Sequence, residues 1–316
     1  MNLAEAVLAG ERLALARLMT QVENDTSEGR AALDALFAYT GRAILVGITG
    51  APGTGKSSLV NQLARCIRHP ADGSQPRRIG IVAVDPSSPF TGGALLGDRV
   101  RMRDLAGDPG VFIRSMASRG TLGGLARTTA EVVQVLDAAG FELILIETVG
   151  VGQDEVDIAR LAHTTLVVEA PGLGDDIQAI KAGILEIADI LVVNKADHPG
   201  AENTERALRA MLEMGAARRH NEADQTEDET WQTPVIKTIA TLGEGIAELV
   251  AEINRHAAYL KASGEWQRRE DHRLRNELDL LVQERLVERW RSQLSVSRIA
   301  ILRASSGGAL PLPAVA

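Results

Sequence analysis

Aromatic residues and cysteine are scarce in this sequence. Aromatic side chains make up 3% of the 316 residues, and Cys66 is the single cysteine. One cysteine cannot form a disulfide within the chain, and no Cys/His spacing typical of a zinc site occurs. The six histidines are spread from His69 to His272, and we expect them to form no cluster. The core must be built from aliphatic residues, and the 45% hydrophobic content is enough for one large domain with appendages or two modest ones.

An excess of basic charge is also missing. The 34 basic and 42 acidic residues give a formal net charge of −8 and a pI of about 5.4. A general nucleic-acid binder or a protein of anionic membranes needs a basic surface, so we expect neither partner. No apolar run reaches about 18 residues, and the charged N-terminal stretch has no signal-peptide core. We therefore expect a cytoplasmic location.

Short apolar runs alternate with helix-like stretches after residue 41. Residues 3–22 and 28–39 have helical spacing of apolar residues and are expected to form two N-terminal helices. Strands with nearly continuous hydrophobicity, separated by helices, are typical of a parallel sheet covered on both faces. The fold class is therefore α/β, a doubly wound and mostly parallel sheet flanked by helices, with helical extensions at both ends. The expected strands are 43–48, 79–84, 143–146, 165–170, 189–194 and 233–240.

The C-terminal third departs from this alternation. Residues 216–232 are polar and rich in acids, which predicts a solvated loop. Residues 265–294 form a long helical stretch, and we favour a second subunit over the chain's own domain as the partner of its apolar stripe. The stripe consists of Leu274, Leu278, Leu281, Leu286, Trp290 and Leu294. The predicted organisation is a helical extension (1–40), a P-loop domain (41–262), a helical and dimerising arm (263–304) and a flexible tail (305–316).

One glycine-rich stretch identifies a nucleotide site. "GAPGTGKS" (50–57) matches G-x-x-x-x-G-K-[ST] between a predicted strand and a predicted helix over 56–68. The glycines let backbone N–H groups surround a phosphate, and the helix N-terminus adds partial positive charge. Lys56 is expected to reach the β- and γ-phosphates, and Ser57 to bind Mg²⁺. The expected phosphate-binding residues are Gly50, Ala51, Pro52, Gly53, Thr54, Gly55, Lys56, Ser57 and Ser58.

The purine is predicted from a second motif. "NKAD" (194–197) follows a strand, at the edge where ligands bind in doubly wound sheets. The Asp197 carboxylate can accept hydrogen bonds from guanine N1–H and the N2 amine, whereas adenine lacks that amine. Asn194 would hold the other edge of the base, and the stem of Lys195 would cover its face. Ala240, at the end of the last predicted strand, completes the expected GTP- and GDP-binding set.

A third motif, "ETVG" (147–150), ends a strand where small GTPases carry D-x-x-G. Glu147 would support Mg²⁺ in place of the aspartate, and the Gly150 amide would sense the γ-phosphate. Val151 occupies the place of the glutamine that orients water in Ras-like proteins, and valine cannot do this. Gln153 could substitute or could simply begin the next helix. Unassisted hydrolysis should therefore be slow.

Several longer motifs resemble a known family. "VDPSSPFTGGALLGDRVRM" (84–102), "SMASRGTLGGLA" (115–126), "ETVGVGQDE" (147–155) and "APGLGDDIQAIKAGILEIAD" (170–189) are similar to the GTPase chaperones of adenosylcobalamin-dependent methylmalonyl-CoA mutase. Some members of that family have been called lysine/arginine/ornithine transport ATPases or kinases. The resemblance is dense over 40–260 and implies a homodimer that binds the mutase, gates cofactor delivery from an adenosyltransferase and protects the mutase.

The resemblance also implies roles for further residues. Asp85 and Asp98 would lie at the magnesium shell, and Lys181 would neutralise transition-state charge, unless it is an exposed helical lysine. The alternatives are a metallochaperone-type GTPase and a transport-associated ATPase or kinase. The expected metal set is Ser57, Asp85, Asp98 and Glu147, and the set expected to act in hydrolysis is Lys56, Asp98, Glu147, Gly150 and Lys181.

Overall fold

The computed structural model describes most of the chain. It describes residues 2–86, 102, 104, 105, 107–118, 124–148, 154–172, 186–222 and 230–293. The chain forms two compact units, residues 1–273 and 274–316, and the boundary between them falls inside the helix Glu265–Gln293. The domain boundaries expected from the sequence stay predictions.

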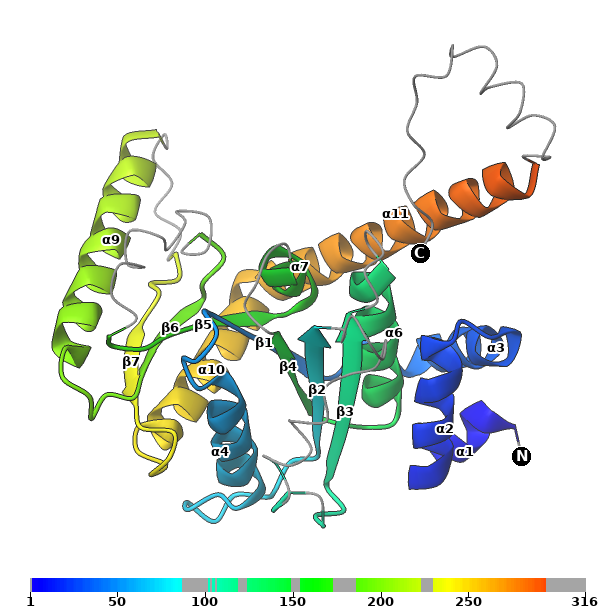
Figure 1. The fold of residues 1–316 in the computed structure, drawn as a ribbon, viewed down its shortest axis with the longest axis horizontal. Coiled ribbons are helices and arrows are strands. Elements are labelled where there is room, and N and C mark those ends of the chain that lie inside the picture. Colours follow the sequence, from blue (N-terminus) through cyan, green and yellow to red (C-terminus); the bar gives the residue numbers. More distant parts are fainter. Residues whose placement is uncertain are drawn as a thin grey trace. The chain divides into compact units, whose positions relative to one another are not determined.

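A seven-stranded sheet forms the centre of the first unit (Figure 1). Its spatial order is β3-β2-β4-β1-β5-β6-β7, and every neighbouring pair is parallel. The central strand β1 is the one that leads into the glycine-rich loop. The strands are β1 (Ile44–Thr49), β2 (Ile79–Pro86), β3 (Val111–Ser118), β4 (Leu143–Thr148), β5 (Thr164–Glu169), β6 (Ile190–Asn194) and β7 (Val235–Thr238).

The doubly wound α/β fold expected from the sequence is confirmed, but the six expected strands omit β3. This strand lies at the edge of the sheet and pairs only with β2 in the described part of the chain. Only its first three residues form an apolar run, and Arg114 and Ser115 follow. An edge strand with one partner does not need the continuous hydrophobicity of a central strand, so β3 lacks the signal that reveals the others.

Helices cover both faces of the sheet (Figure 1). On one face, α4 (Lys56–Arg68) and α10 (Ile246–Ser263) pack against alternate residues of the strands, such as Val46 and Ile48 of β1. On the other face, α6 (Gly124–Ala138) and α7 (Asp154–Leu161) pack against the intervening residues, such as Leu45. This alternation places the two apolar cores on either side of one sheet.

The N-terminal segment forms a further helical layer over α6. It comprises α1 (Leu3–Leu8), α2 (Arg12–Glu23), α3 (Ser27–Leu36) and the short 3₁₀ turn η1 (Phe37–Tyr39). The single helix expected over 3–22 was wrong, because the chain breaks at Gly10, which has a φ of 84°. Residues of these helices and of α6 share one apolar core.

Two long helices complete the described chain. Helix α9 (Ala201–Glu222) extends through the first part of the segment expected to be a loop, so that expectation was wrong for residues 216–222. Alanine, arginine and glutamate are good helix formers, which explains the extension. Helix α11 (Glu265–Gln293) matches the predicted long helix. No helix in the described ranges is both long and apolar enough to cross a membrane.

Candidate nucleotide site

The glycine-rich loop turns tightly between β1 and α4. Gly50, Gly53 and Gly55 have φ values of 137°, 84° and 93°, which favour glycine. A Cβ at Gly50 would lie 2.1 Å from the Val168 carbonyl oxygen, and one at Gly55 would lie 2.4 Å from Asn194 Nδ2. The loop therefore packs against β5 and β6, and its backbone conformation has the shape that the motif requires.

Lys56, the first residue of α4, is buried with its ammonium group inside the loop. Its Nζ donates hydrogen bonds to the carbonyl oxygens of Gly50 (2.7 Å) and Ala51 (3.0 Å). Thr54 Oγ1 also donates to the Ala51 carbonyl (2.9 Å). These contacts hold a positive charge in the concavity where the motif predicts the phosphates.

The next residue joins the loop to β4. Ser57 Oγ donates a hydrogen bond to Glu147 Oε1 at 2.6 Å, and Glu147 is buried. A hydroxyl and a carboxylate are oxygen ligands of the kind that Mg²⁺ prefers. The two residues that the sequence separates by ninety positions thus lie together and fit a magnesium ion. The ion would neutralise phosphate charge there.

Asn194, at the end of β6, connects three segments around the site. Its Nδ2 donates to the Thr54 carbonyl (2.8 Å), and its Oδ1 accepts from Thr238 Oγ1 and from the Ala240 backbone N–H, both at 3.1 Å. Thr238, the last residue of β7, was not anticipated from the sequence. It lies beside Asn194 in the β6–β7 register, and the strand-end position is the signal that could have identified it.

The two charged residues of the NKAD motif point to different places. Lys195 adopts a left-handed conformation (φ 56°), and its Nζ donates to the Gly53 carbonyl at 2.7 Å. The Asp197 side chain is about half exposed, and its Oδ2 lies 3.9 Å from His198 Nε2. The carboxylate is thus accessible to a ligand at the carboxyl edge of the sheet, next to the glycine-rich loop.

The remaining predicted residues are only partly described. Asp98, Gly150 and Lys181 lie outside the described residues. Asp85 is the second-to-last residue of β2, two strands from β1, and its side chain lies outside the description. The structure therefore brings together the glycine-rich loop, Glu147 and the NKAD motif.

The sequence matches one family model over residues 15–295, that of the methylmalonyl-CoA mutase-associated GTPase MeaB. The chain belongs to the MeaB family. It is a GTPase, with the P-loop fold and the nucleotide-binding elements of that class.

Curated relatives of this MeaB-family GTPase are similar over most of their length. A protein of Pyrococcus abyssi, whose name describes it as a GTPase, is 47% identical and the match covers 89% of this chain and 83% of the relative. GTPase ArgK of Escherichia coli is 37% identical, and the match covers 82% of this chain and 76% of ArgK. The mitochondrial methylmalonic aciduria type A homolog of mouse is 32% identical, and the match covers 93% of this chain and 72% of the mouse protein.

Among solved structures, a crystal structure of an LAO/AO transport system kinase is similar to the MeaB-family chain, with a TM-score of 0.68. It is 26% identical, and the match covers 98% of this chain and 92% of that one. The likeness supports the doubly wound P-loop fold, and it extends over the helical segments at both ends of the sheet domain.

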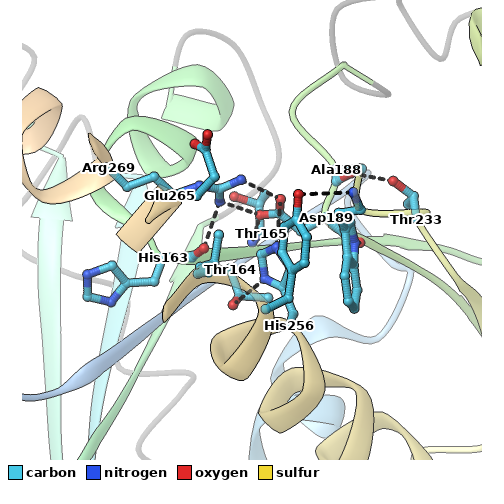
Figure 2. Close-up of polar contacts among 12 residues, drawn as sticks. His163, Thr164, Thr165, Ala188, Asp189, Thr233, His256, Glu265 and Arg269 are labelled. Atoms are coloured by element: carbon cyan, nitrogen blue, oxygen red, sulfur yellow. Dashed lines mark hydrogen bonds and ion pairs between the residues drawn. The ribbon is translucent and has the colours of Figure 1, made fainter. Parts of the chain in front are cut away.

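The structure of the MeaB-family protein also contains a buried polar cluster that the sequence did not predict (Figure 2). Asp189, just before β6, accepts two hydrogen bonds from the Arg269 guanidinium of α11, both at 2.8 Å, and one from the Thr165 N–H. His256 of α10 contacts the same carboxylate, with Nε2 3.3 Å from Oδ1. His163 lies nearby, and its carbonyl oxygen accepts from Arg269 (2.7 Å).

Two of the six histidines, His163 and His256, belong to this cluster, and the described residues contain no group of three or more His, Cys, Asp and Glu side chains that could hold a metal. Burial lowers the pKa of His256 to about 4, although the neighbouring Asp189 favours the charged form. Burial also lowers the pKa of His163, against the effect of Glu270. His163 Nδ1 accepts from the Leu45 N–H (3.0 Å), so the ring proton lies on Nε2 and points to Glu270 Oε1, 2.6 Å away. Both rings are therefore neutral and join α10 and α11 to the sheet.

Proposed function

We propose that this GTPase is a chaperone of an adenosylcobalamin-dependent acyl-CoA mutase of the methylmalonyl-CoA mutase type. The observation that carries the choice of partner is the match to the MeaB family over residues 15–295. GTP binding and hydrolysis would control delivery of the cofactor from an adenosyltransferase and protect the mutase. The similarity to the mouse methylmalonic aciduria type A homolog, over 93% of this chain, supports the same assignment.

The proposed nucleotide complex uses residues that already lie together. The loop amides and Lys56 would hold the phosphates, and Ser57 with Glu147 would hold Mg²⁺. The ammonium of Lys56 would exchange its carbonyl partners for phosphate oxygens, which are stronger acceptors for a cation. Asp85 and Asp98 would complete the magnesium shell, as the family resemblance implies. Asp197 would select guanine, because its exposed carboxylate can accept two N–H groups of that base.

Activation of water needs a group beyond those described. Val151 cannot orient water, so the proposal assigns slow hydrolysis to the isolated protein and faster hydrolysis to its complex with the mutase. Gly150 would sense the γ-phosphate, and Lys181 would neutralise charge in the transition state. If Lys181→Ala leaves mutase-stimulated hydrolysis unchanged, the role of this lysine is discarded.

The proposed assembly is a homodimer formed by the arm. In α11, exposed apolar side chains recur at every fourth position and form a ridge, which we call the α11 ridge. Such i±4 ridges are the surfaces by which helices pack against each other, so the ridge supports pairing with a second copy. The α11 ridge consists of Leu274, Leu278, Val282, Leu286 and Trp290.

The partner is tested by measuring GTP turnover of the purified protein alone and with purified methylmalonyl-, ethylmalonyl- and isobutyryl-CoA mutases. The proposal predicts that one of these enzymes raises turnover and binds more tightly to the protein loaded with a GTP analogue than with GDP. A second candidate, a transport-associated kinase, predicts phosphate transfer from GTP to a protein acceptor instead. Stimulation by none of the mutases would contradict the chaperone proposal.

A further inference from the structure

Two buried threonines meet at the carboxyl ends of the neighbouring strands β1 and β4, next to the candidate nucleotide site. Thr49 is the last residue of β1, directly before Gly50, and Thr148 is the last residue of β4, directly after Glu147. Thr148 Oγ1 donates a hydrogen bond to Thr49 Oγ1 at 3.3 Å. The relative exposure is 0% for Thr49 and 5% for Thr148. If one hydroxyl is removed, bulk water therefore cannot replace it as the partner of the other.

The pair occupies the face of the sheet opposite to the magnesium ligands. Gly47, two residues before Thr49, lies against Ile158 within α7 and Ala162 just beyond it, so Thr49 faces the same side. Helix α7 begins at Asp154, just after the segment 149–153 that follows Thr148. The hydroxyl pair thus joins the strand that begins the glycine-rich loop to the strand that begins the segment containing Gly150.

We propose that Thr148 is a positioning residue for GTP hydrolysis, which ties the end of β4 to the end of β1, directly before the glycine-rich loop. The inference rests on the proposed role of Gly150 in sensing the γ-phosphate. Glu147 is tied to the loop on the other face through Ser57, so the end of β4 is held from both sides. Removing the Thr148 hydroxyl leaves that of Thr49 buried and without this partner, which loosens the strand end where γ-phosphate sensing begins.

The inference predicts an effect that depends on the γ-phosphate. Thr148→Val keeps the shape of the side chain and removes the hydroxyl. We expect a threefold to tenfold loss of kcat and of GTP affinity, about the range that one buried hydrogen bond allows, with GDP affinity unchanged. Thr148→Ser keeps the hydroxyl and should restore the wild-type values. The measurements are GTP turnover and equilibrium binding of fluorescent GDP and a GTP analogue.

A matched control distinguishes this effect from a general loss of structure. Thr238→Val removes another buried hydroxyl, the one that holds Asn194 on the base side of the site. This control variant should lower the affinities for GDP and for GTP by the same factor. The double variant Thr49→Val/Thr148→Val removes both hydroxyls and should recover part of the loss, because no unpaired group remains. If Thr148→Val does not fold, Thr49→Val interrupts the same contact and carries the same expectation.

Two results would overturn the inference. One is a Thr148→Val protein with unchanged kcat and an unchanged ratio of GTP to GDP affinity. The other is an equal loss for both nucleotides, as in the control. Failure of the proposed γ-phosphate sensing gives a different result, because the wild-type protein would then show no conformational difference between its GDP and GTP-analogue states by hydrogen exchange over residues 149–153.

Discussion

At the scale of single residues, the candidate nucleotide site contains polar side chains that each connect two segments. Lys56 binds the loop carbonyls, Ser57 binds Glu147, and Asn194 joins the loop to the end of β7. Their positions were predictable because each follows a strand in a motif of fixed spacing. The supporting role of Thr238 could not be predicted, because a single threonine in a strand belongs to no recognisable motif.

Replacement of Lys56 is expected to remove most of the phosphate affinity. Lys56→Ala deletes a buried positive charge that would bind phosphate oxygens by charge-assisted hydrogen bonds. We expect the affinity for GTP to fall by about 10- to 100-fold, measured by isothermal titration calorimetry. Lys237→Ala, which removes an exposed lysine paired with Glu205, is the control and should bind GTP normally. Normal GTP affinity in Lys56→Ala would exclude the assigned role.

Asp197→Asn is expected to change the purine that binds. An amide offers one acceptor and one donor where the carboxylate offers two acceptors, so it cannot satisfy both guanine N–H groups. The amide donor matches the C2 carbonyl of xanthine instead. We expect GTP affinity to fall by about 100-fold or more and xanthosine triphosphate to bind better than GTP. Competition between the two nucleotides for the variant measures this, and an unchanged preference for GTP would rule out base selection by Asp197.

The neutral histidines make the fold sensitive to acid. The pKa of His256 is about 4 in the folded protein and 6.5 when unfolded, so the unfolded state takes up a proton first as pH falls. The contribution of neutral His256 to the free energy of unfolding is therefore fully present above pH 6.5. It is lost progressively as the pH falls to 4, by up to about 3 kcal/mol. His163, whose pKa is also lowered, acts in the same direction, whereas Glu270, with a pKa of about 2, loses its contribution only below pH 4.5.

Urea unfolding at pH 7 and pH 5 measures this dependence. The free energy of unfolding should be lower at pH 5, and His256→Gln should reduce the difference between the two values. His198→Gln, which changes a largely exposed histidine, is the control and should leave the difference unchanged. Equal pH dependence in His256→Gln and the wild-type protein would show that His256 is not the group responsible.

At the scale of elements, the sequence predicted the buried strands and the helices between them because nearly continuous apolar runs and helical periodicity are strong signals. It did not reveal β3, which pairs with one strand among the described residues, or the break at Gly10 in the N-terminal helices. It also missed the buried cluster around Asp189, because ion pairs between distant segments such as Asp189 and Arg269 leave no periodic pattern.

The glycine-rich loop provides a test of packing at this scale. Gly50→Ala would place a methyl group 2.1 Å from the Val168 carbonyl, whereas the Cβ position of Gly53 has no atom within 4 Å. Both glycines have positive φ, so in each variant the strained backbone of the alanine lowers the free energy of unfolding by about 1 kcal/mol. We expect Gly50→Ala to lose about 3 kcal/mol or more of stability and Gly53→Ala only about 1 kcal/mol, measured by thermal or urea unfolding. Equal losses would contradict the close packing of the loop on β5.

At the scale of the whole molecule, the GTPase continues into helix α11, which carries exposed apolar side chains. The ion pair of Arg269 with Asp189 and the hydrogen bond between His163 and Glu270 hold the start of α11 within the first unit, and the α11 ridge begins at Leu274. Leu278→Glu would place a charge on the ridge and is expected to convert the proposed dimer to a monomer in light-scattering measurements. Gln283→Glu adds a charge at an exposed position off the ridge and should leave the dimer intact. A Leu278→Glu protein that stays dimeric would exclude the ridge as the interface.

The measurement that tests the central claim most directly is calorimetric titration of the purified protein with GTP and with ATP in the presence of magnesium. The arrangement of Lys56, Ser57, Glu147 and the NKAD motif predicts saturable binding of GTP and at least about 100-fold weaker binding of ATP. Equal affinity for the two nucleotides, or no heat of binding with GTP, would contradict the account.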